Sequence, residues 1–200
     1  MMRALMTKTL FVLSILLSAQ ALAFDAGGFR YTVIGATTNV IVEGCPAGPC
    51  SSSDIVIPDA VVDSGITYSV TYIQGSAFYQ NDLTSVIIPD SVTFIGGYAF
   101  AENALTSVII PDSVTTIGNN AFRDNALTSV IIPDSVTIIG YRAFADNNLT
   151  SVIIPDSVTT IVSGAFQDNN LTSVAFLGNF GTFNLNVFQV NVNLATITYV

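Results

Sequence analysis

The chain contains no histidine and no tryptophan, and its 200 residues include only two cysteines. Without histidine, a Ser-His-acid catalytic triad is excluded. General acid–base catalysis would instead need paired carboxylates with separated pKa values, and no motif supplies such a pair. We therefore expect a protein that is not an enzyme and that uses no cofactor or catalytic metal ion.

Positive charge is also scarce. Fourteen acidic residues against five basic ones give a formal net charge of −9, and Arg3 and Lys8 account for two of those bases. Nucleic acids and anionic membrane surfaces are held by clusters of Lys and Arg. Neither is expected as a partner of so acidic a chain.

Long apolar runs are lacking except near the N-terminus. Residues 1–23 combine a basic start, an apolar run over 10–17 and a small-x-small sequence at 21–23. This order is typical of a signal peptide with its cleavage site, and the run is too short for an uncleaved transmembrane anchor. We expect an exported protein, secreted, periplasmic or at the cell surface, without membrane insertion after cleavage.

The two cysteines, Cys45 and Cys50, stand in the sequence CPAGPC. Two prolines and a glycine make a tight loop that can bring the thiols together, and an exported chain meets oxidising conditions. Zinc binding would need two more ligands. A structural disulfide between Cys45 and Cys50 is therefore expected.

Against these absences, one stretch is repeated almost verbatim. Residues 83–104, LTSVIIPDSVTFIGGYAFAENA, recur from Leu105, Leu127 and Leu149, and begin again at Leu171. A fixed internal period of 22 residues predicts a solenoid, in which each copy is one coil stacked on the last. The solenoid is expected to cover residues 54–200.

Each copy, numbered from its leucine, has apolar residues at positions 1, 4, 6, 10, 13, 17 and 18. This pattern predicts a short strand, a Pro-Asp-Ser turn, a second short strand and one helical turn. Stacking converts each inward position into a column of like side chains. We expect a core column of Phe78, Phe100, Phe122, Phe144, Phe166 and Phe188. The asparagines at position 21 are expected to point inward and to bond the backbone of adjacent coils.

Residues 24–53 do not repeat. Residues 29–34 and 39–43 are β-branched, alternating runs that predict a β-hairpin, which would cap the otherwise exposed end of the first coil. The first coil begins at Asp54 and is nine residues longer than the period. The excess, around residues 61–68, predicts a second hairpin with a turn at Asp63-Ser64-Gly65.

The repeated sequence LTSVIIPDSVTTIGNNAF resembles the BspA-type leucine-rich repeat, whose motif is L-x-x-I-x-I-P-x-S-V-x-x-I-G-x-x-A-F. The resemblance implies a curved, β-rich solenoid with a parallel sheet on its concave face and short helical turns. It also implies a bacterial surface or secreted protein that binds host matrix proteins, other cells or other bacteria. Two departures are that the copies end in Asp-Asn-Asn or a similar sequence, where many relatives have Cys, and that Val162 replaces the glycine of the motif.

A column of aspartates follows the prolines, at Asp59, Asp90, Asp112, Asp134 and Asp156. Stacked carboxylates can share calcium ions, whereas Asp after Pro also stabilises turns by bonding the backbone ahead. Because the glycine-rich nonapeptide of calcium-binding solenoids is absent, the turn interpretation is favoured.

Two sets of residues are candidates for binding. The first, called here the Ser/Ile face, holds the outward strand positions 3 and 5 of the full copies, namely Ser85, Ile87, Ser107, Ile109, Ser129, Ile131, Ser151 and Ile153. An exposed isoleucine row can mark an interaction surface, or it can merely reflect β-propensity. The second set holds residues that differ between copies and could give specificity, namely Tyr98, Asn120, Arg123, Tyr141 and Arg142.

Two functions fit these features. The first is an adhesion-type module that binds an extracellular protein or glycan on a solenoid face. The alternative is a structural, self-associating or ice- or surface-templating solenoid without a discrete partner, in which the rows Thr84, Thr106, Thr128 and Thr150 would be the active feature.

Overall fold

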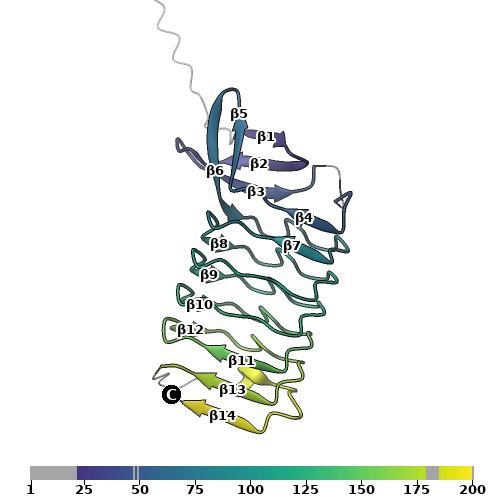
Figure 1. Ribbon diagram of the computed structural model, residues 1–200, viewed down its shortest axis with the longest axis vertical. Helices are drawn as coiled ribbons and strands as arrows, with labels where there is room; N and C mark the ends of the chain where they lie inside the picture. Colours follow the sequence, from purple (N-terminus) through teal and green to yellow (C-terminus); the bar gives the residue numbers. More distant parts are fainter. Residues whose placement is uncertain (1–21, 47, 49, 179–184, 200) are drawn as a thin grey trace, which may run out of the picture.

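An internal period brings successive copies side by side, because each copy buries its apolar positions against its neighbours. The structure, a computed structural model, describes residues 22–46, 48, 50–178 and 185–199. It is an elongated stack of coils with the N-terminal strands at one end and β14 (Thr196–Tyr199) at the other (Figure 1). All but the last two residues of the predicted signal peptide lie outside the described residues.

The N-terminal end is an antiparallel meander of β1 (Ala23–Ala26), β2 (Phe29–Val33) and β3 (Asn39–Gly44). Strands β2 and β3 form the hairpin that the alternating residues predict. Strand β1 was not predicted, because its residues straddle the predicted cleavage site. Strand β3 pairs in parallel with β6 (Ile66–Ile73), and this pairing joins the meander to the coils.

The extra residues of the first coil form the predicted second hairpin. After β4 (Asp54–Val56), strand β5 (Ala60–Asp63) pairs antiparallel with β6. The two residues between them, Ser64 and Gly65, have φ of 48° and 80°. Two consecutive positive φ values are typical of the tight turns whose twist matches that of paired strands.

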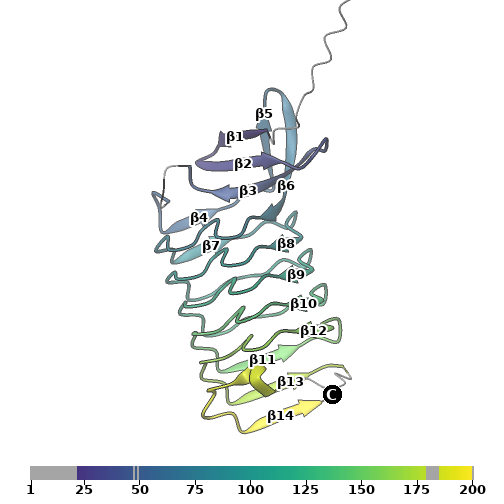
Figure 2. The same ribbon diagram turned by 180° about the vertical axis from the view of Figure 1, so that it is seen from behind.

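Two walls of parallel strands run along the stack (Figures 1 and 2). The first wall is formed by β6, β8 (Phe94–Ile95), β9 (Thr116–Ile117), β10 (Ile138–Ile139) and β12 (Thr160–Ile161). The second wall contains β4 paired with β7 (Ser85–Ile87), and the sheet of β11 (Ser151–Ile154), β13 (Ser173–Phe176) and β14. Residues 107–110 and 129–132 follow the second wall without forming strands. Strand partners in consecutive full coils are 22 residues apart, as with Ile117 and Ile139.

The helical turns expected near the end of each copy are hydrogen-bonded turns in residues 75–169, not helix. One short 3-10 helix, η1 (Leu185–Phe188), is the only helix among the described residues. Two positions in each turn take left-handed backbone, for example Asn120 with φ of 58° and Asp124 with φ of 57°. These two residues reverse the chain within a few positions and leave no room for a continuing helix.

The phenylalanine column forms the centre of the core, as predicted. Each of its rings stacks nearly parallel on the next, with centroids 5.3 to 5.8 Å apart from Phe78 to Phe188. The four middle members, Phe100, Phe122, Phe144 and Phe166, are fully buried. Rows of leucine, valine and isoleucine from both walls complete a continuous core around this stack.

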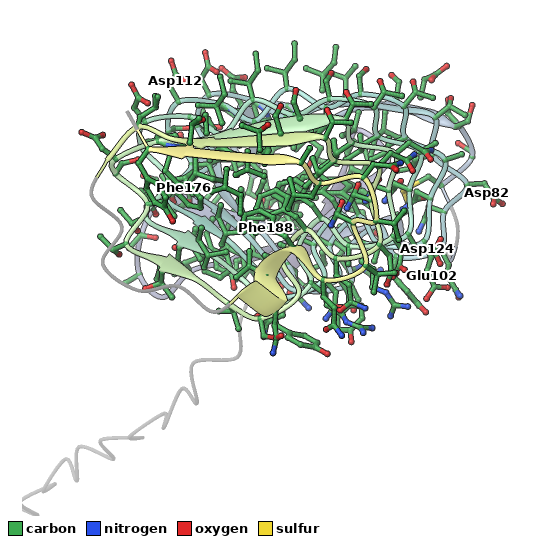
Figure 3. The ribbon with its side chains drawn as sticks, turned by 90° about the horizontal axis from the view of Figure 1, so that it is seen from below. Asp82, Glu102, Asp112, Asp124, Phe176 and Phe188 are labelled. Atoms are coloured by element: carbon green, nitrogen blue, oxygen red, sulfur yellow. A yellow bond between two sulfur atoms is a disulfide. The ribbon has the colours of Figure 1, made fainter. Side chains whose placement is uncertain are left out.

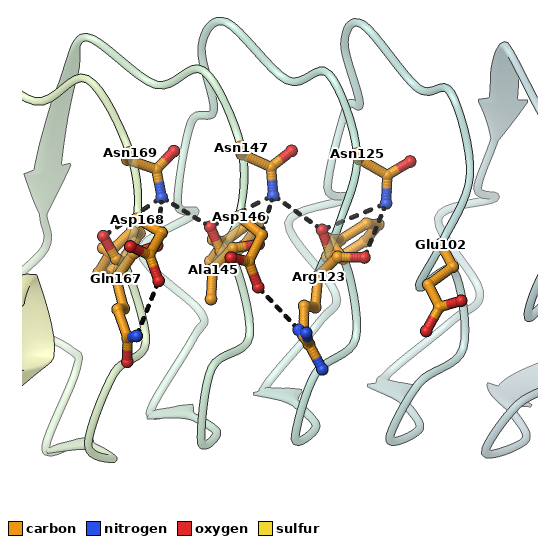
Figure 4. Close-up of polar contacts among 12 residues, drawn as sticks. Glu102, Arg123, Asn125, Ala145, Asp146, Asn147, Gln167, Asp168 and Asn169 are labelled. Atoms are coloured by element: carbon orange, nitrogen blue, oxygen red, sulfur yellow. Dashed lines mark hydrogen bonds and ion pairs between the residues drawn. The ribbon is translucent and has the colours of Figure 1, made fainter. Parts of the chain in front are cut away.

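The position-21 asparagines are inward and bridge coils, which confirms that prediction (Figure 4). Asn147 accepts a 3.0 Å hydrogen bond at Oδ1 from the Leu127 N–H, which closes its own coil. Its Nδ2 donates to the carbonyls of Phe144 and Ala145, and to that of Phe122 in the preceding coil at 2.9 Å. Asn191 of the last coil, which the sequence pattern did not include, bonds Leu171 and Phe166 in the same way.

The expected disulfide is present between Cys45 and Cys50, whose Cα atoms are 5.3 Å apart. It lies between β3 and β4. The loop that it closes is anchored to the first turn by Asn81, whose Oδ1 accepts a hydrogen bond from the Cys50 N–H. The bridge therefore closes the loop that connects the N-terminal meander to the coils, and the Asn81 hydrogen bond holds that loop against the first turn.

Glycine at position 14 allows the coils to approach closely. A Cβ on Gly118 would lie 2.7 Å from the carbonyl carbon of Gly96 and 2.8 Å from the carbonyl oxygen of Ile95. The fourth full coil has Val162 at this position and keeps its turn. The hydrogen bond from the Arg142 N–H to the Ser163 carbonyl is 3.3 Å, compared with 2.7 to 2.8 Å for its equivalents in the preceding coils.

We therefore expect Gly118→Ala to lower the free energy of unfolding by about 1–3 kcal/mol, because the new methyl group must force two backbones apart. Chemical denaturation measures this loss. Val162→Gly is the matched comparison. It should leave the free energy of unfolding unchanged or higher, because the third and fourth full coils already lie farther apart at this position. A Gly118→Ala protein as stable as the parent would contradict the prediction.

Tyr31 in β2 is fully buried, and its hydroxyl has no hydrogen-bond partner among the described residues. Burial raises the pKa of Tyr31 to about 12. Since a tyrosine in the unfolded chain ionises near pH 10, the contribution of Tyr31 to stability is fully present below pH 10 and is lost between pH 10 and 12.

We expect this loss to amount to roughly 2–3 kcal/mol, and Tyr31→Phe should abolish it. At pH 8 the phenylalanine variant should be as stable as the parent, because no hydrogen bond is removed. Denaturation midpoints of both proteins at pH 8 and pH 11.5 measure the difference. Parallel losses in the two proteins would show that Tyr31 is not the group responsible.

Candidate functional site

The Ser/Ile face is the outer surface of the second wall. Alternation along each strand directs Val and the second Ile inward and leaves Ser and the first Ile outside. Ile109 and Ile131 are 84% and 82% exposed, and Ile87 and Ile153 are more than half exposed. The four serines of the face are exposed as well. A row of apolar side chains therefore runs along the stack in solvent.

A shallow groove of about 390 Å³ lies in the middle of this face. It is lined by residues 107–110 and 129–131 together with Asp112 and Pro133. The groove lies where the second wall lacks strands, and its two most exposed lining residues are Ile109 and Ile131. The arrangement offers an apolar hollow bordered by serine hydroxyls.

The aspartate column borders the same face, and Figure 3 shows Asp112 at one edge of it. Its members Asp90, Asp112, Asp134 and Asp156 are all exposed. Within the part of the chain that the structure describes, no group of three or more His, Cys, Asp or Glu side chains is placed to hold a metal ion. The column gives this edge of the face a row of negative charge.

The second candidate set lies elsewhere. Tyr98, Asn120 and Arg142 occupy position 16 of successive coils, and Tyr141 precedes Arg142. Backbone hydrogen bonds link their turns from coil to coil and continue from Gly164 to Asn186 in η1. Figure 3 shows η1 on the side of the stack away from β13 and β14. The structure therefore does not bring these four residues, called here the Tyr/Arg cluster, onto the Ser/Ile face.

Arg123, the fifth candidate for specificity, has a partner within the solenoid. Its Nε donates to Asp146 Oδ2 of the next coil at 2.8 Å (Figure 4). This hydrogen bond raises the pKa of Arg123. Because its guanidinium is engaged in joining two coils, we place Arg123 outside the Tyr/Arg cluster.

Two residues near the cluster were missed by the sequence pattern. Asn119 Oδ1 accepts a hydrogen bond from the Tyr141 N–H at 2.8 Å, and Tyr79 lies edge-on to Tyr98 with ring centroids 6.1 Å apart. The Tyr79 hydroxyl donates to Glu102 at 2.8 Å, and this bond raises the pKa of Tyr79. Tyr79 precedes the first full copy, which begins at Leu83. A comparison of the copies could have found it only if the longer first coil had been included.

Stacked coils with two columns of short parallel strands, a phenylalanine core and asparagine bridges define a leucine-rich-repeat solenoid. Residues 66–198 match the BspA type Leucine rich repeat region, in six copies. The chain belongs to this family, as its motif predicted. No curated protein matches the sequence.

Similar solved structures are bacterial leucine-rich repeat proteins. A T. pallidum Leucine Rich Repeat protein has a TM-score of 0.69 and 26% identity, over 88% of this chain and 85% of that one. A leucine-rich repeat protein from Bacteroides ovatus has a TM-score of 0.66 and 23% identity over 87% of this chain. The pneumococcal vaccine antigen PcpA has a TM-score of 0.58 and 18% identity over 78% of this chain.

This chain spans 52% of the Bacteroides ovatus protein and 50% of the pneumococcal antigen, so it corresponds to about half of each. The likeness to these two concerns the fold. Among the described residues, no helix has the length and hydropathy needed to cross a bilayer.

Proposed function

We propose that this chain is an exported, non-enzymatic binding module of the adhesion type that holds an extracellular protein partner on its Ser/Ile face. The observation that carries the proposal is the row of isoleucines, of which Ile109 and Ile131 are more than four-fifths exposed. Burying such a row against a partner removes apolar surface from water, at roughly 25 cal/mol for each Å². An apolar strip with a polar border has the composition of a protein interaction surface.

The negative charge along one edge of the Ser/Ile face indicates what kind of partner would bind there. The exposed aspartates along one edge, in a chain of net charge −9, favour a partner with basic residues beside an apolar strip. Membership of a family of surface proteins supports this assignment. The membership and the Cys45–Cys50 disulfide also support export to an oxidising compartment.

We also propose a domain organisation for the chain. A signal peptide over residues 1–23 would be removed, and residues 24–53 would cap the first coil of a solenoid of 22-residue coils over 54–200. In support, β3 pairs with β6 and covers the edge that the first wall would otherwise expose. Capping leaves the lateral faces of the stack as the surfaces for a partner.

The structural or templating alternative receives less support. Templating of a periodic surface needs a regular lattice of side chains, whereas the second wall loses its strand pairing at residues 107–110 and 129–132. Self-association would bring together chains that each carry a net charge of −9. Both features favour a discrete partner.

A binding array of matrix proteins and bacterial cells tests the proposal with the double variant Ile109→Ser/Ile131→Ser. A protein that binds the parent should lose affinity for this variant by ten-fold or more, because the apolar centre of the interface is removed. The matched control is Val62→Ser/Val192→Ser, which removes two similarly exposed apolar side chains outside the face. Equal binding of both variants, or binding lost equally by both, would contradict the assignment of the face.

A further inference from the structure

The Tyr/Arg cluster is built on backbone that its residues adopt at a cost. Tyr98, Asn120 and Arg142 have φ of 59°, 58° and 51°, in the left-handed region. Glycine enters this region freely and Asn tolerates it, whereas Tyr and Arg are strained there. The following coil has Gly164 at the same position with φ of 71°. Because this position is left-handed in every coil from Ser76 to Gly164, the turn itself requires the backbone, and only the side chains differ from coil to coil.

Asn120 belongs to the coil between those of Tyr98 and Arg142 and is only 4% exposed. Its backbone N–H bonds the Tyr141 carbonyl at 2.7 Å, which ties it to the next coil. Its side-chain amide makes no hydrogen bond with any described residue, unlike the buried amides of Asn147 and Asn169. Although the residue as a whole is buried, its amide atoms reach the surface and are therefore available to bond a ligand.

Arg142 is also incompletely paired. Its Nε is buried and has no hydrogen-bond partner within the described residues. Its guanidinium lies over the Tyr141 ring, 5.6 Å from the ring centroid, which fixes its plane. Arg30 and Arg123, by contrast, are each paired with a carboxylate. Arg142 is therefore the one arginine of the described residues that is oriented but not neutralised.

Two tyrosines supply flat, half-open surfaces beside these polar groups. Tyr98 and Tyr141 are 42% and 41% exposed and belong to the coils on either side of Asn120. Hydrogen bonds from the Tyr98 N–H to the Asn119 carbonyl and from the Tyr141 N–H to Asn119 Oδ1 fasten their backbones to that central coil. Tyr79 packs edge-on against Tyr98.

We propose that the Tyr/Arg cluster binds a sugar that carries a carboxylate, such as a uronic or sialic acid. The Arg142 guanidinium is suited to a carboxylate, the Asn120 amide can both donate to and accept from sugar hydroxyls, and the tyrosine rings can stack on a pyranose face. Arg142 can balance a single negative charge, whereas the net charge of −9 repels polysulfated chains, which carry many. The ligand should therefore carry one isolated carboxylate. This site is separate from the Ser/Ile face, and neither proposal depends on the other.

The test is calorimetric titration of the protein with an oligosaccharide that ends in glucuronic acid, beside the same oligosaccharide ending in glucose. We expect the acidic probe to bind at least ten-fold more tightly. Arg142→Gln should weaken its binding by about ten- to one-hundred-fold, through loss of a charge-assisted hydrogen bond. Arg30→Gln, which removes an equal charge from β2, is the matched control and should bind as the parent does.

A second variant guards against an effect on folding. Asn120→Asp keeps the shape of the side chain but puts a negative charge beside the sugar carboxylate, so it should abolish binding of the acidic probe. Thermal melts of each variant report whether the solenoid is intact. Equal binding of the two oligosaccharides, no binding of the acidic one, or unchanged affinity in folded Arg142→Gln would overturn the proposal. A Glu-containing peptide that binds as tightly as the acidic sugar would overturn the assignment to a sugar.

Discussion

Replacing Phe122 with alanine should lower the free energy of unfolding by about 3–5 kcal/mol, the loss typical of a cavity left by a large buried ring. Phe122 is fully buried, and its ring lies 5.3 Å from that of Phe100 and 5.4 Å from that of Phe144. Removing it leaves both neighbours without a stacking partner on one side. The rigid backbone ladders around the site limit how far the coils can collapse into the space.

The matched control is Phe94→Ala. The Phe94 ring is only partly buried and stacks on a single partner, Tyr72, with centroids 4.4 Å apart. Its loss should cost about 1 kcal/mol, the value of an aromatic pair with little cavity. Urea denaturation compares the two variants. If Phe94→Ala destabilises the protein as much as Phe122→Ala, the core does not depend on the stack.

Replacing Asn147 with alanine should cost about 2–5 kcal/mol, because the buried Leu127 N–H is left without an acceptor and three backbone carbonyls each lose one hydrogen bond. The Leu127 N–H loses its acceptor, and the carbonyl of Phe122 in the preceding coil loses a donor at 2.9 Å. Water cannot easily replace the amide, since Asn147 is 7% exposed and Leu127 is fully buried.

The adjacent residue provides the comparison. Asn148 is exposed, so Asn148→Ala removes an identical amide with an expected change within about 0.5 kcal/mol. Denaturation midpoints measure both effects, and amide hydrogen exchange at Leu127 should quicken only in Asn147→Ala. A stable Asn147→Ala protein with slow exchange at Leu127 would refute the structural role of the bridge.

The phenylalanine column and the asparagine bridges could be predicted from the sequence because each member recurs at one position of the period. Stacking then places like residues together whatever the path of the coil. The second hairpin and the disulfide were also foreseen, from the nine extra residues of the first coil and from the short CPAGPC loop. These predictions needed only a count of residues and the chemistry of turns.

The positions of the candidate binding residues needed more than the period. A spacing of 22 residues determines which side chains share a column, but it does not determine how the chain bends within one coil. Those bends depend on left-handed residues such as Arg142 and Asp146, and they put the Tyr/Arg cluster away from the Ser/Ile face. The sequence Ser-Val-Ile-Ile forms β11 at 151–154 but no strand at 107–110. Identical local sequences cannot predict that difference.

The ion pair of Arg123 and the burial of Asn120 were hidden for a related reason. The ion pair depends on a side chain one coil away, Asp146, and the 4% exposure of Asn120 is a property of the stacked coils and not of one copy. Variation between copies indicated that these positions were special. It could not indicate whether a residue serves a ligand or the neighbouring coil.

The close match of strand partners at a separation of 22 residues has a consequence for how the gene can change. Deleting or duplicating one whole copy, such as residues 105–126, joins neighbours that already offer the same phenylalanine, asparagine and strand partners. Unequal recombination between copies can therefore lengthen or shorten the protein without a new core having to arise. Each event also adds or removes one isoleucine from the exposed row. The length of the Ser/Ile face can therefore change between generations by one coil at a time.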